Sequence, residues 1–336
     1  MNTLRLALLP VPALVLLTGC PGSDSDAREI IIALETNNVD VCGIDALNRL
    51  RCSNDEGVWD LDHTFVGSTS FIALSSSQRD VCALEDNDGD GAGDVYCFRP
   101  ERLLSDVYEV HEGPYTHFTA VGAAGPFGQI VCGLDPDGAI HCPDAEPGSG
   151  LDTPPEGPFV DLWGMEDSFR TGICALSADG ALTCFGNDDF TDWYEECPLP
   201  TSDVIDVDMG GAPFPVVLTA DGALSGWSAY ANDDGDDYVC LSESAVDAVA
   251  VETGQSVVCT LDSTSAISCI DIDTSSSSDT SGEDSILKNS PAGSFSLLAG
   301  NPNNVGTFMC AASGHEVTCW GDGWNDGEPE TFSFYD

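Results

Sequence analysis

Aspartates alternate with other residues in the run EDNDGDGAGD (85–94), the stretch whose residue types are best suited to bind a metal ion. Carboxylate and carbonyl oxygens are the ligands that Ca²⁺ prefers, and Gly91 stands where a calcium-binding loop makes its sharp turn. The candidate ligands occupy positions 1, 3, 5, 7 and 9 of such a loop: Asp86, Asp88, Asp90, Ala92 through its carbonyl, and Asp94. We therefore predict a bound Ca²⁺ ion that stiffens this loop. The alternative is a solvated hairpin tip without metal, since Cys97 stands where a helix-flanked loop has its bidentate glutamate.

Motifs for catalysis are absent from the sequence. It contains no H-E-x-x-H, no G-x-S-x-G, no phosphate loop and no dinucleotide-binding glycine pattern. The histidines occupy unrelated places: His63, His111, His117, His141 and His315. Paired carboxylates are so frequent that no glycosidase-like pair stands out. The sequence therefore names no catalytic residue, although an active site assembled from several repeats would leave no local motif.

The N-terminus has the pattern of an export signal. Arg5 precedes an apolar run over 6–17 that is too short to cross a bilayer, and small residues then lead to Cys20. The end of the run, LTGC (17–20), resembles the lipobox of bacterial lipoproteins. The resemblance implies a signal peptide over 1–19, lipidation of Cys20 and a polar tether over 20–29. The predicted location is the periplasmic or cell-surface side of a bacterial outer membrane; the alternative is an ordinary signal peptide with a chance cysteine.

Composition agrees with export and limits the partners. Fifteen cysteines in 336 residues are typical of an oxidising compartment. The formal net charge is −49, from 58 acidic and nine basic residues. Such a chain repels nucleic acid and anionic lipid headgroups, so membrane contact is expected only through the anchor. Hydrophobic residues make up 42% of the chain, enough for a core, so the acidity is expected on the surface.

Two sequence signatures recur seven times, at intervals of about 45 residues. The first is a pair of cysteines ten or so residues apart, as in ICALSADGALTC (173–184); PVVLTADGALSGW (215–227) is a copy that has lost both. The second, upstream of each, is a pair of apolar residues three positions apart: Ile31 and Leu34, Phe71 and Leu74, Phe118 and Val121, Phe159 and Leu162, Val204 and Val207, Val246 and Val249, Phe295 and Leu298. A repeated two-part unit predicts a repeat architecture.

The cysteine spacing predicts a disulfide-linked β-hairpin in most repeats. If Cys174 faces Cys184 on antiparallel strands, the loop is 178–180 with Gly180 at the left-handed position, a favoured connection. The same arithmetic gives six pairs: 42 with 52, 82 with 97, 132 with 142, 174 with 184, 259 with 269, and 310 with 319. Cys197 and Cys240 occupy similar places in adjacent repeats, so a link between them is also predicted. Zinc or an iron cluster is disfavoured because paired short C-x₂-C spacings are missing.

The repeats predict an all-β fold, a seven-bladed β-propeller of about 45-residue repeats. Both faces of these strands are apolar, so each small sheet must be covered on both sides. The competing arrangement is an open stack with capped ends. Closure is favoured because both ends of the chain look like strands, which suggests that they share one blade. Residues 272–285 are a low-complexity insertion, expected to be exposed and flexible.

The repeat resembles that of the regulator of chromosome condensation family in its bacterial form. The pattern C-A-L-x-x-D-G-x-x-x-C-[WF]-G-x-[ND] occurs over 174–188 and more loosely over 310–322, and the likeness covers 30–336. It implies a seven-bladed propeller. The family's eukaryotic founder acts on a small GTPase and on chromatin, and an exported chain of this charge is expected to meet neither. Bacterial relatives include a secreted β-lactamase inhibitor that binds a protein with its propeller face, which implies the mode of binding and not the target.

Two function classes follow from the sequence. The first is a lipid-anchored module that binds a protein or glycan at the cell envelope, stabilised by calcium. The second is an extracytoplasmic, calcium-dependent hydrolase or lyase with its site on one propeller face. The missing catalytic motifs favour the first.

Overall fold

The computed structural model describes most of the repeat region. The described residues are 30–36, 41–54, 57–60, 70–76, 81–86, 89, 91–98, 108–109, 120–124, 130–166, 171–188, 190, 198–209, 215–230, 237–245, 247–254, 257–271, 289–300, 308–321 and 327–334. The signal peptide and tether predicted over 1–29 and the insertion over 272–285 lie outside them.

The described residues form seven antiparallel sheets, each built from strands consecutive in the chain. Four sheets have four strands: β1 (Ile31–Thr36), β2 (Val41–Asp45), β3 (Leu50–Asn54) and β4 (Gly57–Asp60); β5 (Phe71–Ser76), β6 (Val81–Glu85), β7 (Val95–Phe98) and β8 (Tyr108–Glu109); β15 (Val204–Asp208), β16 (Val216–Thr219), β17 (Ala223–Tyr230) and β18 (Asp237–Ser244); β22 (Leu297–Gly300), β23 (Met309–Ser313), β24 (Glu316–Gly321) and β25 (Gly327–Ser333). Three sheets have three strands: β9 (Ala120–Ala124), β10 (Ile130–Leu134) and β11 (Ile140–His141); β12 (Phe159–Glu166), β13 (Thr171–Ser177) and β14 (Leu182–Gly186); β19 (Ala248–Thr253), β20 (Val257–Asp262) and β21 (Ile267–Asp271). The sheets correspond one to one with the predicted repeats.

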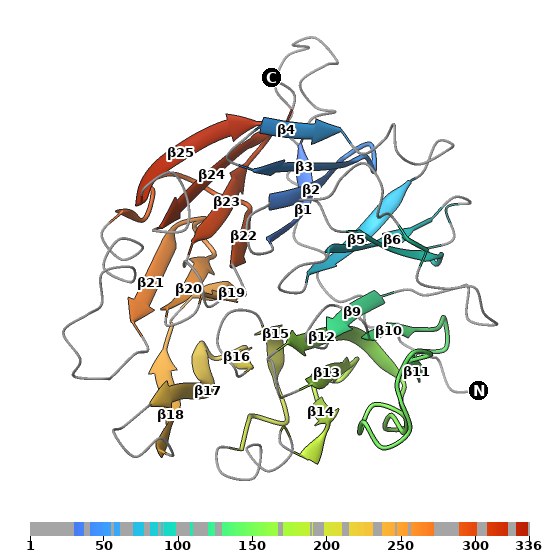
Figure 1. The fold of residues 1–336 in the computed structure, drawn as a ribbon. Helices are drawn as coiled ribbons and strands as arrows, with labels where there is room; N and C mark the ends of the chain where they lie inside the picture. The colour runs from blue at the N-terminus through green and yellow to red at the C-terminus, as the bar shows by residue number, and fades with distance from the viewer. Residues whose placement is uncertain are drawn as a thin grey trace, which may run out of the picture.

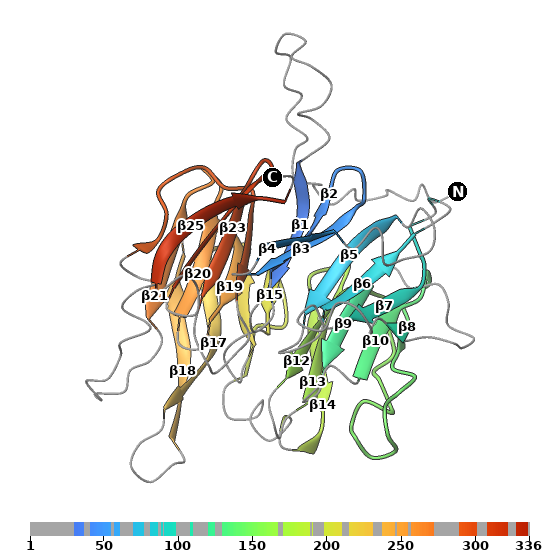
Figure 2. The same ribbon diagram turned by 45° about the horizontal axis from the view of Figure 1, so that its top comes forward.

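The sheets stand around a common axis like blades, with the first strand of each nearest the centre (Figure 1). We call these first strands the inner strands: β1, β5, β9, β12, β15, β19 and β22. The same arrangement is visible when the ring is tilted (Figure 2). Small antiparallel sheets repeated radially make a β-propeller, so the predicted all-β propeller is confirmed.

The apolar core is divided among the interfaces between neighbouring sheets. Seven clusters of buried side chains occur in the described residues, and each joins two consecutive sheets. One of them packs Ile31 and Leu34 of the first sheet against Phe308 of the last. This arrangement explains why the strands are apolar on both faces, because each face covers a different neighbour.

The predicted hairpins and disulfides are present. Cys174 pairs with Cys184 in register between β13 and β14. All six predicted bonds occur: Cys42–Cys52, Cys82–Cys97, Cys132–Cys142, Cys174–Cys184, Cys259–Cys269 and Cys310–Cys319. Cys240 is also disulfide-bonded, and its predicted partner Cys197 lies outside the described residues.

The hairpin turns use the predicted left-handed position. Gly180 has a φ of 81° and Asn48 a φ of 62°, a region in which glycine and asparagine are best tolerated. In the sixth repeat, which lacks glycine there, Ser265 takes this conformation with a φ of 70°. The carboxylate of Asp262 supports this turn by accepting the backbone N–H groups of Thr264 and Ala266 at 2.7 and 3.0 Å.

The last and first sheets are joined by the same backbone hydrogen bond that joins other neighbouring sheets. In most steps of the ring the carbonyl of the left-handed turn residue accepts a hydrogen bond from the N–H that starts the next inner strand. Val204 N donates to Gly180 O at 3.2 Å, and Phe295 N donates to Ser265 O at 2.9 Å. Across the seam, Ile31 N donates to Gly314 O at 2.9 Å. The last and first sheets are therefore joined like the internal ones, and the open stack is wrong.

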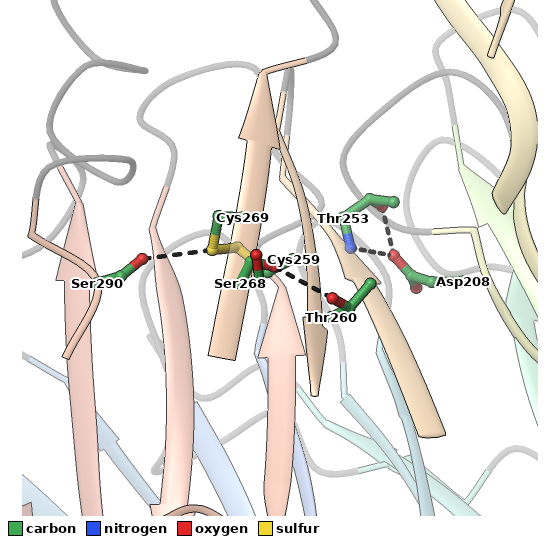
Figure 3. Close-up of a disulfide and its surroundings, with 7 residues drawn as sticks. All are labelled: Asp208, Thr253, Cys259, Thr260, Ser268, Cys269 and Ser290. Atoms are coloured by element: carbon green, nitrogen blue, oxygen red, sulfur yellow. Dashed lines mark hydrogen bonds between the residues drawn. A yellow bond between two sulfur atoms is a disulfide. The ribbon is translucent and has the colours of Figure 1, made fainter. Parts of the chain in front are cut away.

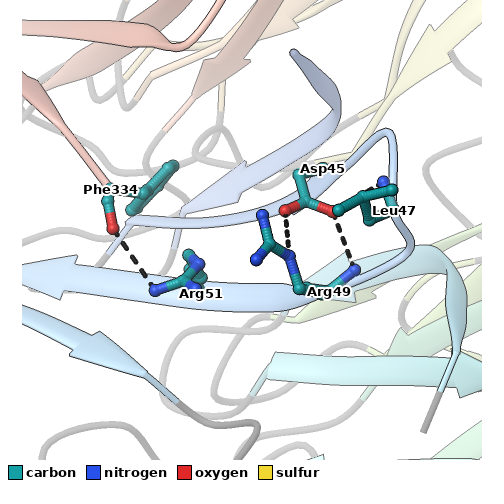
Figure 4. A network of polar contacts seen from close by, with 5 residues as sticks. All are labelled: Asp45, Leu47, Arg49, Arg51 and Phe334. Carbon is teal, nitrogen blue, oxygen red and sulfur yellow. Dashed lines mark hydrogen bonds and ion pairs between the residues drawn. The ribbon is translucent and has the colours of Figure 1, made fainter. Parts of the chain in front are cut away.

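Two sequence expectations need correction. The terminal strands do not share a blade, because β1 pairs within the first sheet and β25 within the last. The chain instead crosses the seam with Phe334, which packs beside Ile31, while Arg51 Nη1 approaches Phe334 O at 3.5 Å (Figure 4). In the sixth repeat the buried apolar pair is Ala248 and Val251, whereas the predicted Val249 is exposed and the predicted Val246 lies outside the described residues.

The second correction concerns an inner strand that contains a β-bulge. Five inner strands contain one extra residue just after their first buried residue, as between Ala248 and Ala250 of β19. The extra residue there is Val249, which has no partner in register and is 50% exposed. Spacing alone does not distinguish Val249 from Val251, because both are apolar and β-branched.

Candidate functional site

The predicted calcium loop is only partly described. Asp88 and Asp90 lie outside the described residues, while Asp86, Ala92 and Asp94 lie within them. The Asp86 side chain is buried at the end of β6. Its two carboxylate oxygens accept the N–H groups of Gly89 at 2.6 Å and Gly91 at 2.9 Å. Asp86 thus shapes the turn through the backbone, which is a role that does not require a metal.

Gly89 and Gly91 have left-handed φ values of 79° and 86°, and no atom lies within 4 Å of a Cβ built on either. Their conformation, rather than lack of room, therefore favours glycine. Within the described residues, no group of three or more histidine, cysteine or acidic side chains is placed to hold a metal ion. The calcium site remains a prediction.

A cluster of carboxylates that the sequence reasoning missed lies on the inner strands near the axis. We call them the axial carboxylates: Glu35 of β1, Asp161 of β12, Asp206 and Asp208 of β15, and Glu252 of β19. Counted from the first buried residue of each inner strand, they occupy only the third and fifth positions. Alternate residues of a strand share one face, so all five point in the same sense around the ring.

Each of four axial carboxylates accepts a hydrogen bond from the next inner strand around the ring. Asp208 Oδ2 accepts the Thr253 N–H at 2.6 Å and also the Thr253 hydroxyl (Figure 3). Asp206 Oδ2 accepts the Val251 N–H at 2.8 Å. Glu252 Oε2 likewise accepts the Gly300 N–H at 3.1 Å.

The same pattern continues across the seam and into the second sheet. Glu35 Oε2 accepts the hydroxyl of Ser76 at 2.9 Å. In the opposite sense, Thr36 Oγ1 donates to the Gly300 carbonyl at 2.5 Å, which links the first sheet to the last. An inner strand has one edge without a strand partner, and these side chains satisfy its backbone groups.

Burial raises the pKa values of these groups, and the neighbouring acids add to the effect. Burial raises the pKa of Glu35 to about 8, with the charges of Asp208 and Asp206 adding to the effect and the Ser76 hydrogen bond opposing it. Burial raises the pKa of Asp206 to about 7, against the hydrogen bonds from the backbone. The pKa of Glu252 is raised well above its usual value, by burial and by the neighbouring carboxylates.

Asp161 differs from the other four. Its side chain is exposed at the surface, and its Oδ1 accepts only the N–H of the adjacent Leu162, at 2.9 Å, among the hydrogen bonds described. The protein atoms around the carboxylate still raise its pKa to about 6 by desolvation. It is therefore the axial carboxylate best placed to meet a molecule from solvent.

A signal for these residues was present in the sequence. The inner strands read IIALET, FIALSS, FVDLWGME, VIDVD and AVAVET, and the acids fall at matched offsets. Aligning the repeats on the apolar pair would have shown this. The offset error in the sixth repeat hid it, because counting from Val246 instead of Ala248 placed Glu252 two positions beyond the place that Glu35 has in the first repeat.

The predicted lipidation site, Cys20, lies outside the described residues. No helix among the residues the structure describes is long and apolar enough to span a membrane. The six described disulfides are typical of an oxidising, extracytoplasmic environment.

The fold and bonds together define the class of protein: an all-β, disulfide-linked propeller. No protein-family model matches the chain, and no curated protein matches its sequence.

Several solved structures resemble it in fold. The computationally designed Ika8 protein has a TM-score of 0.49 at 13% identity, covering 91% of this chain and 96% of that one. Yeast RCC1 (Prp20), in a structure with Kap60, gives 0.47 at 12% identity, covering 87% and 70%. The CRINKLY WD40 ectodomain of the Arabidopsis thaliana receptor kinase ACR4 gives 0.40 at 13% identity, covering 87% and 81%. These similarities are too low to support an inference about function, so the assignment of the fold rests on the strand pairing.

Proposed function

We propose that the chain is an exported, lipid-anchored β-propeller that binds a protein or glycan partner at the bacterial cell envelope. The anchor is Cys20 after removal of 1–19, and 30–336 form the binding domain on the periplasmic or cell-surface side of the outer membrane. The resemblance of the repeats to those of the regulator of chromosome condensation family supports this proposal. The disulfides support an extracytoplasmic site, and the charge of −49 opposes binding of nucleic acid or of the GTPase used by the family's founder.

One observation favours binding over catalysis. Four of the axial carboxylates are engaged by the next inner strand, as Asp208 is by Thr253. Acids held in this way join blades, and they make the propeller a stiff frame whose loops are free to contact a partner. A rigid, preorganised surface loses little conformational entropy when it binds.

The proposal is tested in the producing cells. The full chain should fractionate with membranes, and its Cys20→Ser variant should not. The chain lacking residues 1–20, immobilised with and without calcium, should retain one envelope component reproducibly. Failure of every envelope protein and glycan to bind in both conditions would exclude the binding role.

Asp161 favours a second candidate, a hydrolase or lyase, because the residue is exposed while the protein around its carboxyl desolvates that group. Its pKa of about 6 suits a general acid or base near neutral pH. Turnover of envelope glycans or esters that is lost in Asp161→Asn, with the melting temperature unchanged, would establish this alternative.

We also propose that Ca²⁺ binds the loop formed by Asp86, Asp88, Asp90, Ala92 and Asp94. The ion would offset repulsion among these carboxylates and stabilise the hairpin between β6 and β7. Millimolar calcium should raise the melting temperature by a few degrees.

The calcium response should disappear in Asp90→Asn, whereas Asp137→Asn, in the corresponding turn of the third sheet, should retain it. Asp90 is a better position than Asp86 for this test, because Asp86 also holds the backbone of Gly89 and Gly91. An unchanged melting temperature of the parent chain in calcium would refute the site.

A further inference from the structure

Large apolar side chains are exposed at one face of the ring. Six in the described residues are between 41% and 50% exposed: Ile30, Ile32, Leu47, Val160, Ile205 and Val249. Four of them, Ile32, Val160, Ile205 and Val249, are the extra residue of the inner-strand bulge. A bulged residue lacks a partner on the next strand, which leaves its side chain free to turn outward.

The other two exposed side chains lie at the same face. Ile30 directly precedes β1, and Leu47 lies in the turn between β2 and β3. The carbonyl of the neighbouring Asn48 accepts the N–H of Phe71, which starts the next inner strand. These turns and the first residues of the inner strands therefore lie together, and we call this side of the ring the start face.

Strand propensity does not explain the apolar residues at the bulge. Isoleucine and valine favour strands, but the fold accepts a polar residue at this position. Ser296 occupies it in the last sheet and is exposed. Four apolar side chains thus recur at one exposed repeat position of the start face, and exposed apolar side chains on one face are typical of an interaction surface.

The charge beside these apolar side chains indicates the partner. Asp161 follows Val160, and Asp206 follows Ile205, so carboxylates adjoin the apolar side chains in two neighbouring sheets. The two sheets are neighbours in the ring, since Val204 N donates to Gly180 O at 3.2 Å and one apolar cluster joins them. A lysine or arginine side chain combines an aliphatic stem with a cationic end. The stem matches the apolar side chains of this face, and the cationic end matches the carboxylates beside them. A second copy of the chain would instead bring another charge of −49.

We propose that the start face docks a basic protein, inserting a lysine or arginine flanked by apolar residues against Val160 and Ile205. This inference rests on the proposed binding function and names the class of partner and the face used. Apolar contact supplies affinity, and the acidic surface selects cationic partners and speeds their approach.

The test uses three cyclic hairpin peptides that differ only at the tip: Leu-Arg-Leu, Leu-Gln-Leu and Gly-Arg-Gly. Calorimetry with the chain lacking residues 1–20 should show the first peptide binding at least about tenfold more tightly than either of the others. A tenfold difference corresponds to about 1.4 kcal/mol, within the range expected of one well-placed side chain. Added salt should weaken the binding of the first peptide.

Variants identify the face. The double variant Val160→Thr/Ile205→Thr keeps β-branched residues and should weaken the first peptide about tenfold. The control Ser242→Ile, at an exposed position of the outer strand β18, should leave the affinity unchanged. Melting temperatures report whether each variant is folded.

Equal binding of the arginine and glutamine peptides would overturn the choice of a basic partner. Equal binding by the parent chain and the double variant, or no binding of any peptide, would overturn the choice of face. An envelope component that the parent and the double variant retain equally would leave the proposed binding function intact while refuting this inference. Absence of any partner in both assays would instead remove the binding function itself.

Discussion

At the scale of single residues, the axial carboxylates connect sequence to stability. Burying a carboxylate removes its hydration, which costs free energy. In compensation, each of three axial carboxylates accepts a backbone N–H: Asp206, Asp208 and Glu252. The pKa of Asp206 is still raised, to about 7, so these hydrogen bonds do not fully offset the effect of burial. The inner ring is therefore sensitive to pH.

Stability is expected to fall as the pH rises from about 4.5 to 8. The pKa of Glu35 is about 8 in the folded chain and 4.5 as a free side chain, so the folded state binds the proton more tightly. The stabilisation that protonated Glu35 contributes to the free energy of unfolding is complete below pH 4.5 and is lost as the pH passes 8. One unit of pKa is about 1.4 kcal/mol, so the melting temperature should drop by at least about 2 °C from pH 5 to 9.

Glu35→Gln should flatten this pH dependence, because the amide keeps the shape and can still accept the Ser76 hydrogen bond without carrying a charge. The exposed Glu243→Gln on β18 is the matched control and should follow the parent. Thermal melts at four pH values suffice. A parent slope that Glu35→Gln leaves unchanged would show that the other acids dominate.

At the scale of elements, most of the described hairpins combine three local devices. The disulfide joins opposed residues, a left-handed residue closes the turn, and an acid or hydroxyl before the turn accepts its N–H groups. In the first hairpin, Asp45 Oδ1 accepts Leu47 N at 2.8 Å and Asp45 Oδ2 pairs with Arg49 at 2.6 Å (Figure 4). Such units form from local sequence, since their disulfides join residues only 9 to 15 positions apart.

Removing one hairpin disulfide should cost about 2–3 kcal/mol of unfolding free energy, the chain-entropy value for a loop of about ten residues. The double variants Cys174→Ala/Cys184→Ala and Cys259→Ala/Cys269→Ala affect sheets that do not adjoin. Their losses should therefore add within about 0.5 kcal/mol when both are combined. Urea unfolding measures this; strongly non-additive losses would indicate that strain passes from blade to blade.

At the scale of the whole molecule, the ring depends on equivalent interfaces. Every described pair of consecutive sheets shares an apolar cluster, and the seam has its own, around Ile31 and Phe334. A closed ring has no end sheets that would need a polar cap, whereas an open stack has two.

Hydrogen exchange should show that the seam is as stable as the internal interfaces. The Ile31 amide, bonded to Gly314 O, should be protected to within about tenfold of the Val204 amide, bonded to Gly180 O. Exchange by mass spectrometry at peptide resolution separates the two. An Ile31 amide that exchanges more than about a hundredfold faster would mean that the ring opens at the seam.

The sequence by itself determined the local units: the repeat, the six hairpin disulfides, the left-handed turns at Gly180 and Asn48, and the propeller class. These follow from residues close in the chain, whose spacing limits the geometry. Three features were decided only by the tertiary structure. They are the bulges, the buried pair Ala248 and Val251 of the sixth repeat, and the cluster of acids from four strands about the axis. The seam was decided there too, because packing of Phe334 against Ile31 joins residues about 300 positions apart, and no local spacing encodes such a contact.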